Sequence, residues 1–258
     1  MEKKFAISLG GGAARGAFHL GVLHFMEENN IQIDAYSGSS IGAIISASHA
    51  SGVKAKEQLK IFSSKELKSV LKFNYFKNGL LKIERENKIL NDLLPISNLE
   101  EMPKKVYVTA YDLKKRQLHY FDKGDSHILC MASSALIPLF KPISYENMYL
   151  IDGGLFDCLP IKVFEKQEYE VFAIDLFPKS HKKIKKLSFN PIRYIKKGLF
   201  TQLYENHSHS ILNANTYLGS YEIRDYSMFT FKELNNCFNF GYKEAKKIFL
   251  SNKSTLKV

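Results

Sequence analysis

Cysteine is scarce in this sequence, and the three that occur, Cys130, Cys158 and Cys237, lie far apart. An odd number without a close pair excludes a disulfide framework and a zinc-ligand pair, which favours a reducing compartment. Long hydrophobic runs are also missing, since no stretch reaches the roughly 18 uncharged apolar residues of a membrane span. Met1 to Phe5 lead directly into a short apolar pattern, without the features of a signal peptide. We therefore expect a cytoplasmic protein, soluble or peripheral on the inner face of the membrane.

Acidic residues are outnumbered, because 26 Asp and Glu face 37 Lys and Arg, giving a formal net charge of +11. The excess is concentrated in the stretch 179–197, where basic residues are interleaved with Ile184, Phe189 and other apolar side chains. This basic surface stretch suits an anionic membrane surface, and a solvated loop is the alternative interpretation. The sequence contains no zinc-finger spacing and no RNA-stacking motif, so no nucleic-acid partner is expected.

The chain of 258 residues, 45% of them hydrophobic, is long enough for one large α/β domain or two small ones, and we predict a single domain over 1–258. Short apolar segments alternate with helical patterns, which predicts a mostly parallel central sheet between helices, a three-layer α/β/α fold. Strands are expected at 4–9, 33–36, 105–110, 117–121, 148–151, 169–176 and 221–224. Helices are expected at 17–30, after the second strand up to Gly52, at 201–218 and at 239–250. The Lys-rich segment 54–94 is interpreted as a helical, lid-like insertion.

A glycine-rich turn, Gly10-Gly11-Gly12-Ala13-Ala14-Arg15-Gly16, separates the first predicted strand from the first helix. Unpaired N–H groups and the helix dipole favour negative charge at such a position. A dinucleotide fingerprint needs glycines at offsets 0, 2 and 5, which this turn lacks, although Asp34 lies near the distance expected for a ribose-binding acid. The Gly-Lys-Ser/Thr of a phosphate loop is absent. The other candidate is an oxyanion hole, which requires a nucleophile nearby.

Gly38-x-Ser40-x-Gly42 follows the second predicted strand and precedes a helix. This is the nucleophile-elbow pattern, in which flanking glycines permit the sharp turn that exposes a serine hydroxyl. A small-residue helix start, with Ser40 as its cap, is the structural alternative. The strand, turn and helix around the motif, and the glycine turn one unit earlier, favour the elbow.

Ile151-Asp152-Gly153-Gly154 places a carboxylate at the end of a predicted strand, with two glycines that permit a close approach. An ordinary Asp-Gly turn is the alternative. Asp152 can act on Ser40 as a base only with a close hydrogen bond in a partly dry site. No late histidine lies in a loop at the end of a strand, so a Ser-His-Asp triad is not expected. His207-Ser208-His209 would direct its rings apart on a helix, so no metal or other cofactor is expected.

The three motifs together resemble those of the patatin-like phospholipase family, most closely its compact bacterial members with a single domain. The similarity extends along nearly the whole chain, through Gly21-Val22-Leu23, the segments 109–113 and 132–135 before Pro138, Leu159-Pro160-Ile161 and Gly241-Tyr242. The resemblance implies a patatin-like fold and a Ser/Asp dyad in place of a triad. Ser40 would be the nucleophile and Asp152 the proton acceptor.

The resemblance also assigns the oxyanion hole to the amides of Gly11, Gly12 and Ala13. Ala13 stands where the family usually has a third glycine, so a left-handed backbone there would be strained. Arg15 matches the family's basic position and is expected to pin the turn rather than to contact phosphate. The implied activity is hydrolysis of lipid acyl esters of a phospholipid or lysophospholipid. An acyl-thioester hydrolase, or a non-catalytic regulator that binds lipid or acyl groups, is the alternative, and the sequence does not predict the oligomeric state.

Overall fold

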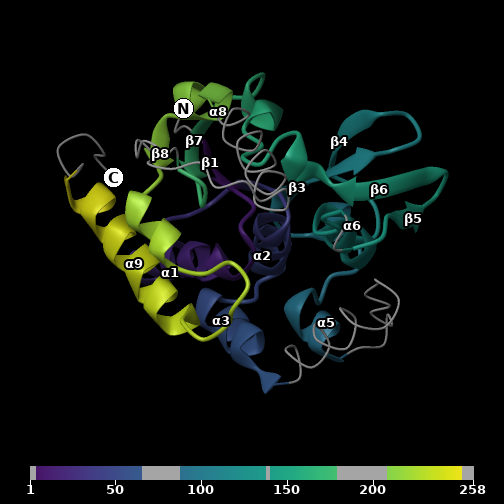
Figure 1. Ribbon diagram of the computed structural model, residues 1–258. Coiled ribbons are helices and arrows are strands. Elements are labelled where there is room, and N and C mark those ends of the chain that lie inside the picture. Colours follow the sequence, from purple (N-terminus) through teal and green to yellow (C-terminus); the bar gives the residue numbers. More distant parts are fainter. Residues whose placement is uncertain (1–3, 66–87, 138–139, 179–207, 252–258) are drawn as a thin grey trace, which may run out of the picture.

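The computed structural model describes residues 4–65, 88–137, 140–178 and 208–251 (Figure 1). The basic stretch 179–197 and the middle of the predicted insertion, 66–87, lie outside the described residues. Both described ends of that segment contain a helix. Across the part of the chain that is described, none of the helices is both long and apolar enough to cross a bilayer.

The structure describes eight strands, six of which were predicted from the sequence. They are β1 (Lys4–Leu9), β2 (Ala35–Gly38), β3 (Lys105–Asp112), β4 (Gln117–Phe121), β5 (Ile143–Tyr145), β6 (Met148–Asp152), β7 (Tyr169–Ile174) and β8 (Thr216–Leu218). The α-helices are α1 (Gly16–Glu28), α2 (Ile41–Ala50), α3 (Ala55–Ser63), α5 (Lys88–Leu93), α6 (Ser126–Ser133), α8 (Ser208–Asn213) and α9 (Leu234–Ser251). Short 3₁₀ helices, η1 (Ala13–Arg15), η2 (Leu99–Glu101), η3 (Gly153–Leu155), η4 (Lys162–Phe164) and η5 (Tyr221–Asp225), join them.

The strands form one sheet in the order β5-β6-β3-β2-β1-β7-β8, with β4 paired to β3 beside this path. β1 is parallel to β2 and β7, and the pairs β2 with β3 and β7 with β8 are also parallel. β4, β5 and β6 pair antiparallel at one end of the sheet. The prediction of a mostly parallel central sheet is confirmed, and the antiparallel end is the feature that places the candidate base.

Two predictions near the end of the chain were wrong. The helix expected over 201–218 does not reach its predicted end, because Thr216–Leu218 forms the edge strand β8 beside β7. The strand expected at Tyr221–Arg224 is instead part of η5. Tertiary contacts explain the second difference: the guanidinium of Arg15 binds the carbonyl of Arg224, and the side chain of Ile223 is fully buried. Such contacts override a short local pattern.

Side chains alternate between the two faces of the sheet, as the period of a strand requires. Ile7 and Leu9 of β1 belong to the larger core, which α1, α2, α6 and α9 cover. Ala6 belongs to a smaller core on the other face, together with Leu159 and Phe164 of the segment that contains η4. The helices α1 and α9 lie side by side over the larger core (Figure 1). The two covered faces make up the three-layer arrangement.

Two glycines allow α1 and α9 to touch through their backbones. A Cβ atom on Gly21 would lie 1.9 Å from the carbonyl oxygen of Phe238. One on Gly241 would lie 2.1 Å from the carbonyl oxygen of Phe18. Any larger residue at either position would therefore push the helices apart. Since α1 begins at the glycine turn, this contact fixes the helix that supports the candidate site.

Candidate active site

The strands β2 and β6 run toward each other along the same edge of β3, so that their last residues lie close together. β4 occupies one edge of β3, where it pairs with Val108 and Ala110. β2 also pairs with Val108 and β6 also pairs with Ala110, so both of these strands lie on the opposite edge of β3. Gly38, the last residue of β2, lies opposite Val108, and Asp152, the last residue of β6, lies opposite Ala110. Between them, Thr109 Oγ1 donates a hydrogen bond to the carbonyl of Gly38 at 3.2 Å. This register brings Asp152 next to the turn that carries Ser40.

Ser40 lies on a sharp, strained turn. Its backbone has φ 53° and ψ −124°, a conformation that residues other than glycine rarely adopt. A Cβ atom on Gly42 would lie 2.0 Å from the carbonyl oxygen of Leu9, and one on Gly38 would lie 2.4 Å from the backbone of Gly42. Only glycine fits at both flanks. The motif thus has the geometry of a nucleophile elbow, and the Ser40 side chain remains partly exposed at its tip.

The Asp152 carboxylate is buried beside this turn. Its Oδ1 accepts a hydrogen bond from the N–H of Gly154 at 2.7 Å, and the Ser40 side chain lies close enough to the carboxylate to influence its pKa. Burial raises the pKa of Asp152 to about 7, although the Gly154 N–H and the Ser40 side chain both lower it. The structure therefore brings the two predicted catalytic side chains into contact. A carboxyl group with a pKa near neutrality is suited to taking and returning a proton.

The glycine turn lies against the elbow, and its first peptide group is fixed on both sides. A Cβ atom on Gly11 would lie 3.3 Å from the Cβ of Ser40. The carbonyl of Gly10 lies 2.8 Å from Nε2 of the fully buried His19, and burial lowers the pKa of His19 to about 4. A neutral ring in this position donates Nε2–H to the carbonyl. The N–H of Gly11 donates to the carbonyl of Cys158 at 3.2 Å.

Of the three amides predicted for the oxyanion hole, two have no acceptor in the part of the chain that is described. The Gly11 N–H is occupied, and the N–H of Ala14 donates to the carbonyl of Met228 at 3.0 Å. For the N–H groups of Gly12 and Ala13, no acceptor is found among the described residues. Ala13 has φ 50°, the left-handed conformation anticipated from its place in the motif. Two consecutive N–H groups without acceptors are available as donors to an anion.

Arg15 holds the far side of the turn. Its guanidinium is buried and donates to three main-chain carbonyls, those of Tyr226 at 2.9 Å, Leu176 at 3.1 Å and Arg224 at 3.2 Å. The N–H of Arg15 also donates to the carbonyl of Gly12 at 3.2 Å, which orients the peptide group that presents the Ala13 N–H. These contacts agree with the expected role of Arg15 in pinning the turn.

The end of α6 contacts the backbones of both candidate catalytic residues, which the sequence did not indicate. Ser133 Oγ accepts the N–H of Ser40 at 2.9 Å. Two residues later, the carbonyl of Ala135 accepts the N–H of Asp152 at 3.1 Å. Ser133 and Ala135 belong to a segment of the family resemblance, but small residues at the end of a helix give no sequence signal for such contacts.

The dinucleotide alternative is not supported by the position of Asp34. Its Oδ2 accepts the N–H of Phe5 at 2.8 Å, near the start of β1, whereas the glycine turn follows the end of that strand. Asp34 is therefore held at the end of β1 that lies away from the glycine turn. The described residues also contain no group of three or more His, Cys, Asp or Glu side chains that could hold a metal ion.

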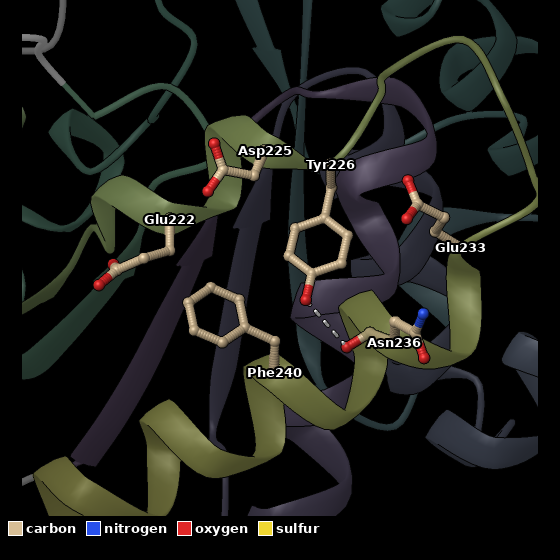
Figure 2. Close-up of a pocket in the computed structure, with 6 residues that line it drawn as sticks. All are labelled: Glu222, Asp225, Tyr226, Glu233, Asn236 and Phe240. Atoms are coloured by element: carbon tan, nitrogen blue, oxygen red, sulfur yellow. Dashed lines mark hydrogen bonds between the residues drawn. The ribbon is translucent and has the colours of Figure 1, made fainter.

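A cavity of about 320 Å³ lies between η5 and α9 (Figure 2). Its lining residues are Glu222, Asp225, Tyr226, Glu233, Asn236 and Phe240. The rings of Tyr226 and Phe240 stack with centroids 5.8 Å apart. Neither Ser40 nor Asp152 lines this acidic cavity, so it is not the candidate catalytic crevice.

Comparison with known proteins agrees with this geometry. Residues 7–165 match the family model described as patatin-like phospholipase. An uncharacterised NTE family protein of Mycobacterium bovis is 28% identical over 160 residues, which cover 61% of this chain and 44% of that protein. A lysophospholipase NTE1 of Coccidioides immitis is 29% identical over 181 residues, which cover 67% of this chain and 12% of that protein. The chain thus spans less than half the length of these relatives.

The fold is also similar to a solved structure. VipD of Legionella pneumophila superposes with a TM-score of 0.55 at 14% identity, covering 97% of this chain and 67% of that one. At this identity the likeness concerns the fold alone. It confirms the predicted patatin-like α/β arrangement.

Proposed function

Because the chain belongs to the patatin-like phospholipase family, we propose that it is a serine acyl hydrolase that cleaves lipid carboxylic esters through Ser40 and Asp152. The observation that carries the proposal is the contact between the Ser40 hydroxyl and the buried Asp152 carboxylate, beside the N–H groups of Gly12 and Ala13. A nucleophile, a base and two amide donors are the groups that acyl transfer requires.

In the first step, Asp152 takes the proton of the Ser40 hydroxyl while Oγ attacks the ester carbonyl carbon. The carbonyl oxygen becomes an oxyanion, which the N–H groups of Gly12 and Ala13 stabilise. When the tetrahedral intermediate collapses, the bond to the alcohol oxygen breaks and the Asp152 carboxyl returns its proton to the leaving alcohol. The product is an acyl ester on Ser40.

In the second step, Asp152 takes a proton from water, and the resulting hydroxide oxygen attacks the acyl carbon. The same two N–H groups stabilise the second oxyanion. Its collapse breaks the bond to Ser40 Oγ, which recovers the proton from Asp152, and the fatty acid is released. The raised pKa suits Asp152 to this role, because in each step the carboxylate must first accept a proton and then give it up.

A phospholipid or lysophospholipid is the proposed substrate class, supported by the family and by a relative named lysophospholipase. The basic stretch 179–197 supports an anionic membrane surface as the place of action, because lysine and arginine are attracted to anionic headgroups.

The proposal is tested with a fluorophosphonate probe and a p-nitrophenyl acyl ester. Wild-type protein should be labelled and should hydrolyse the ester, whereas Ser40→Ala should do neither and should retain its fold. Ser48→Ala is the matched control, because Ser48 is a buried serine of α2 outside the candidate site. Undiminished turnover in Ser40→Ala would falsify the assignment.

A second assay addresses the substrate class. Release of fatty acid from lysophospholipid micelles should depend on Ser40 in the same way as ester hydrolysis. Turnover of an acyl thioester with no activity on any lipid ester would contradict the lipid assignment, while leaving Ser40 as the nucleophile. Failure of the probe to label the wild-type protein would point instead to a non-catalytic binding protein.

A further inference from the structure

The antiparallel end of the sheet extends beyond the level of the candidate site. β2 ends at Gly38 opposite Val108, but β3 continues to Asp112 and is followed by Leu113. At the rise of an extended strand, Leu113 lies roughly 16 Å past Val108. Figure 1 shows β4, β5 and β6 at the end of the molecule away from α9. We call the part formed by residues 110–121 and 143–151 the arm.

Exposed apolar side chains gather on the arm and beside it. Six large hydrophobic side chains are exposed among the described residues, and Leu113, Tyr149 and Phe156 are three of them, with 39%, 48% and 41% exposure. The N–H of Leu113 donates to the carbonyl of Tyr149, so the two residues are cross-strand neighbours on one face. Phe156 stacks on Tyr111 of the same face, with ring centroids 3.7 Å apart. These residues form one continuous apolar stripe.

Three consecutive basic residues, Lys114, Lys115 and Arg116, are exposed on the turn at the tip of the arm. Within the described part of the chain, no ion pair joins any of them to a carboxylate. The carboxylate of the neighbouring Asp112 is buried and accepts main-chain N–H groups of this turn, so it does not pair with these side chains at the surface. Glu146, on the adjacent turn between β5 and β6, is exposed. The three positive charges outnumber the negative charges of Asp112 and Glu146, so the tip remains positive.

One basic side chain is fixed directly over the stripe. Lys114 Nζ lies 4.4 Å from the centroid of the Tyr149 ring and donates to the carbonyl of Asn147 at 3.0 Å. An aromatic ring, an aliphatic side chain and a fixed cation at one tip are the combination found at membrane interfaces, where rings enter the headgroup region and cations meet lipid phosphates.

We propose that the arm is a docking surface for an anionic lipid membrane, with Leu113 and Tyr149 entering the interface and Lys114, Lys115 and Arg116 contacting the headgroups. The lipid partner rests on the proposed function, but binding is independent of catalysis. The arm extends past the carboxyl edge of β2, where Ser40 lies, so docking by its tip brings that edge toward the lipid. The positive tip favours an anionic membrane over a second copy of this positively charged chain.

The test is co-sedimentation with vesicles of phosphatidylcholine alone or of equal parts phosphatidylcholine and phosphatidylglycerol. Wild-type protein should bind the anionic vesicles more strongly, and added salt should weaken the binding. Lys115→Gln/Arg116→Gln should lower the partition coefficient about tenfold or more. Leu113→Ser/Tyr149→Ser should lower binding to the same vesicles by a similar factor.

Matched control variants distinguish the contribution of the arm to vesicle binding from that of total charge or of exposed apolar residues elsewhere. Lys243→Gln/Lys246→Gln removes two exposed charges from α9, and Leu212→Ser removes a more exposed leucine from α8. Both should retain wild-type binding. Equal loss in arm and control variants, unchanged binding in the arm variants, or no preference of the wild type for anionic vesicles would each overturn the proposal. A shift of the arm variants from dimer to monomer in size-exclusion chromatography would also overturn it.

Hydrolysis of soluble p-nitrophenyl ester distinguishes this proposal from the proposed function. The arm variants should hydrolyse the soluble ester at the wild-type rate, because their side chains do not touch Ser40 or Asp152. If the wild type has no esterase activity but binds anionic vesicles through the arm, the catalytic proposal fails and the docking surface stands. If esterase activity is present and the arm variants bind normally, only the docking surface fails.

Discussion

The hydroxyl of Ser40 lies next to the buried carboxylate of Asp152, and burial raises the pKa of this carboxyl to about 7. The proposed base acts only when ionised. We therefore expect kcat/KM for a soluble ester to rise with pH through about 7 and then to level off. A pH profile measured with p-nitrophenyl ester, corrected for spontaneous hydrolysis, checks this. A flat profile from about pH 5 to pH 8 would contradict Asp152 as the base.

The raised pKa of Asp152 also predicts that this residue lowers the free energy of unfolding at neutral pH. Below pH 3.8, the ordinary pKa of an aspartate side chain, the carboxyl is protonated in both the folded and the unfolded chain. Between 3.8 and about 7 the unfolded chain loses the proton that the folded chain retains, so the free energy of unfolding falls as pH rises. The full effect is on the order of 4 kcal/mol.

Asp152→Asn should therefore be inactive and yet more stable than the wild type at about pH 8, with the difference shrinking in acid. Thermal unfolding at several pH values measures this. The control is Asp122→Asn, which changes a carboxylate that pairs with Lys105 near the surface, away from the candidate site. If Asp152→Asn is less stable than the wild type at every pH, the carboxylate is a structural requirement of the fold.

The sequence predicted most of the strands and both motif turns, because each is encoded locally. Residues 4–9 and 117–121 became strands with the predicted bounds, and the glycines around Ser40 fit only as glycine. The contact of Ser40 with Asp152 was predicted through the family resemblance. Its physical basis, two strands meeting along one edge of β3, depends on pairings between distant segments that no local pattern encodes.

The details that sequence missed are tertiary hydrogen bonds. Nothing in the motif shows that the Gly11 N–H is engaged by Cys158, because that carbonyl comes from a distant loop. Equally, the N–H of Ser40 could have found many acceptors, and Ser133 became one only because α6 packs against α2. These contacts decide which amides remain available at the proposed oxyanion hole and how firmly the elbow is held.

Ala13→Gly should stabilise the protein. Ala13 has φ 50°, and a non-glycine residue in the left-handed region costs about 1 kcal/mol. Glycine removes this strain and retains the N–H proposed for the oxyanion hole, so activity should persist. Urea unfolding measures the gain. Ala14→Gly is the matched control, because Ala14 lies in η1 without a positive φ, and glycine there should destabilise. Equal effects of both variants would contradict strain at position 13.

Ser133→Ala should lower kcat about tenfold with little change in KM for a soluble ester. The variant leaves the N–H of Ser40 without its acceptor, so the strained elbow is held less firmly. Ser133→Thr, which keeps a hydroxyl, should recover part of the loss. Ser134→Ala is the control, because its hydroxyl binds the carbonyl of Cys130 and not the elbow. Similar kcat values in the two alanine variants would contradict a positioning role for Ser133.

Arg15→Lys should impair catalysis almost as much as Arg15→Ala. The guanidinium reaches three carbonyls in different directions, which one ammonium group cannot do. Losing these bonds frees the turn that presents the Gly12 and Ala13 N–H groups. Since one donor to an oxyanion is worth about 10²-fold to 10³-fold in kcat, we expect kcat to fall at least tenfold while KM for a soluble ester changes little. Steady-state kinetics at matched folding, verified by circular dichroism, measures this. If Arg15→Lys instead raises KM for lipid substrates only and leaves kcat unchanged, Arg15 binds the substrate phosphate and does not position the turn.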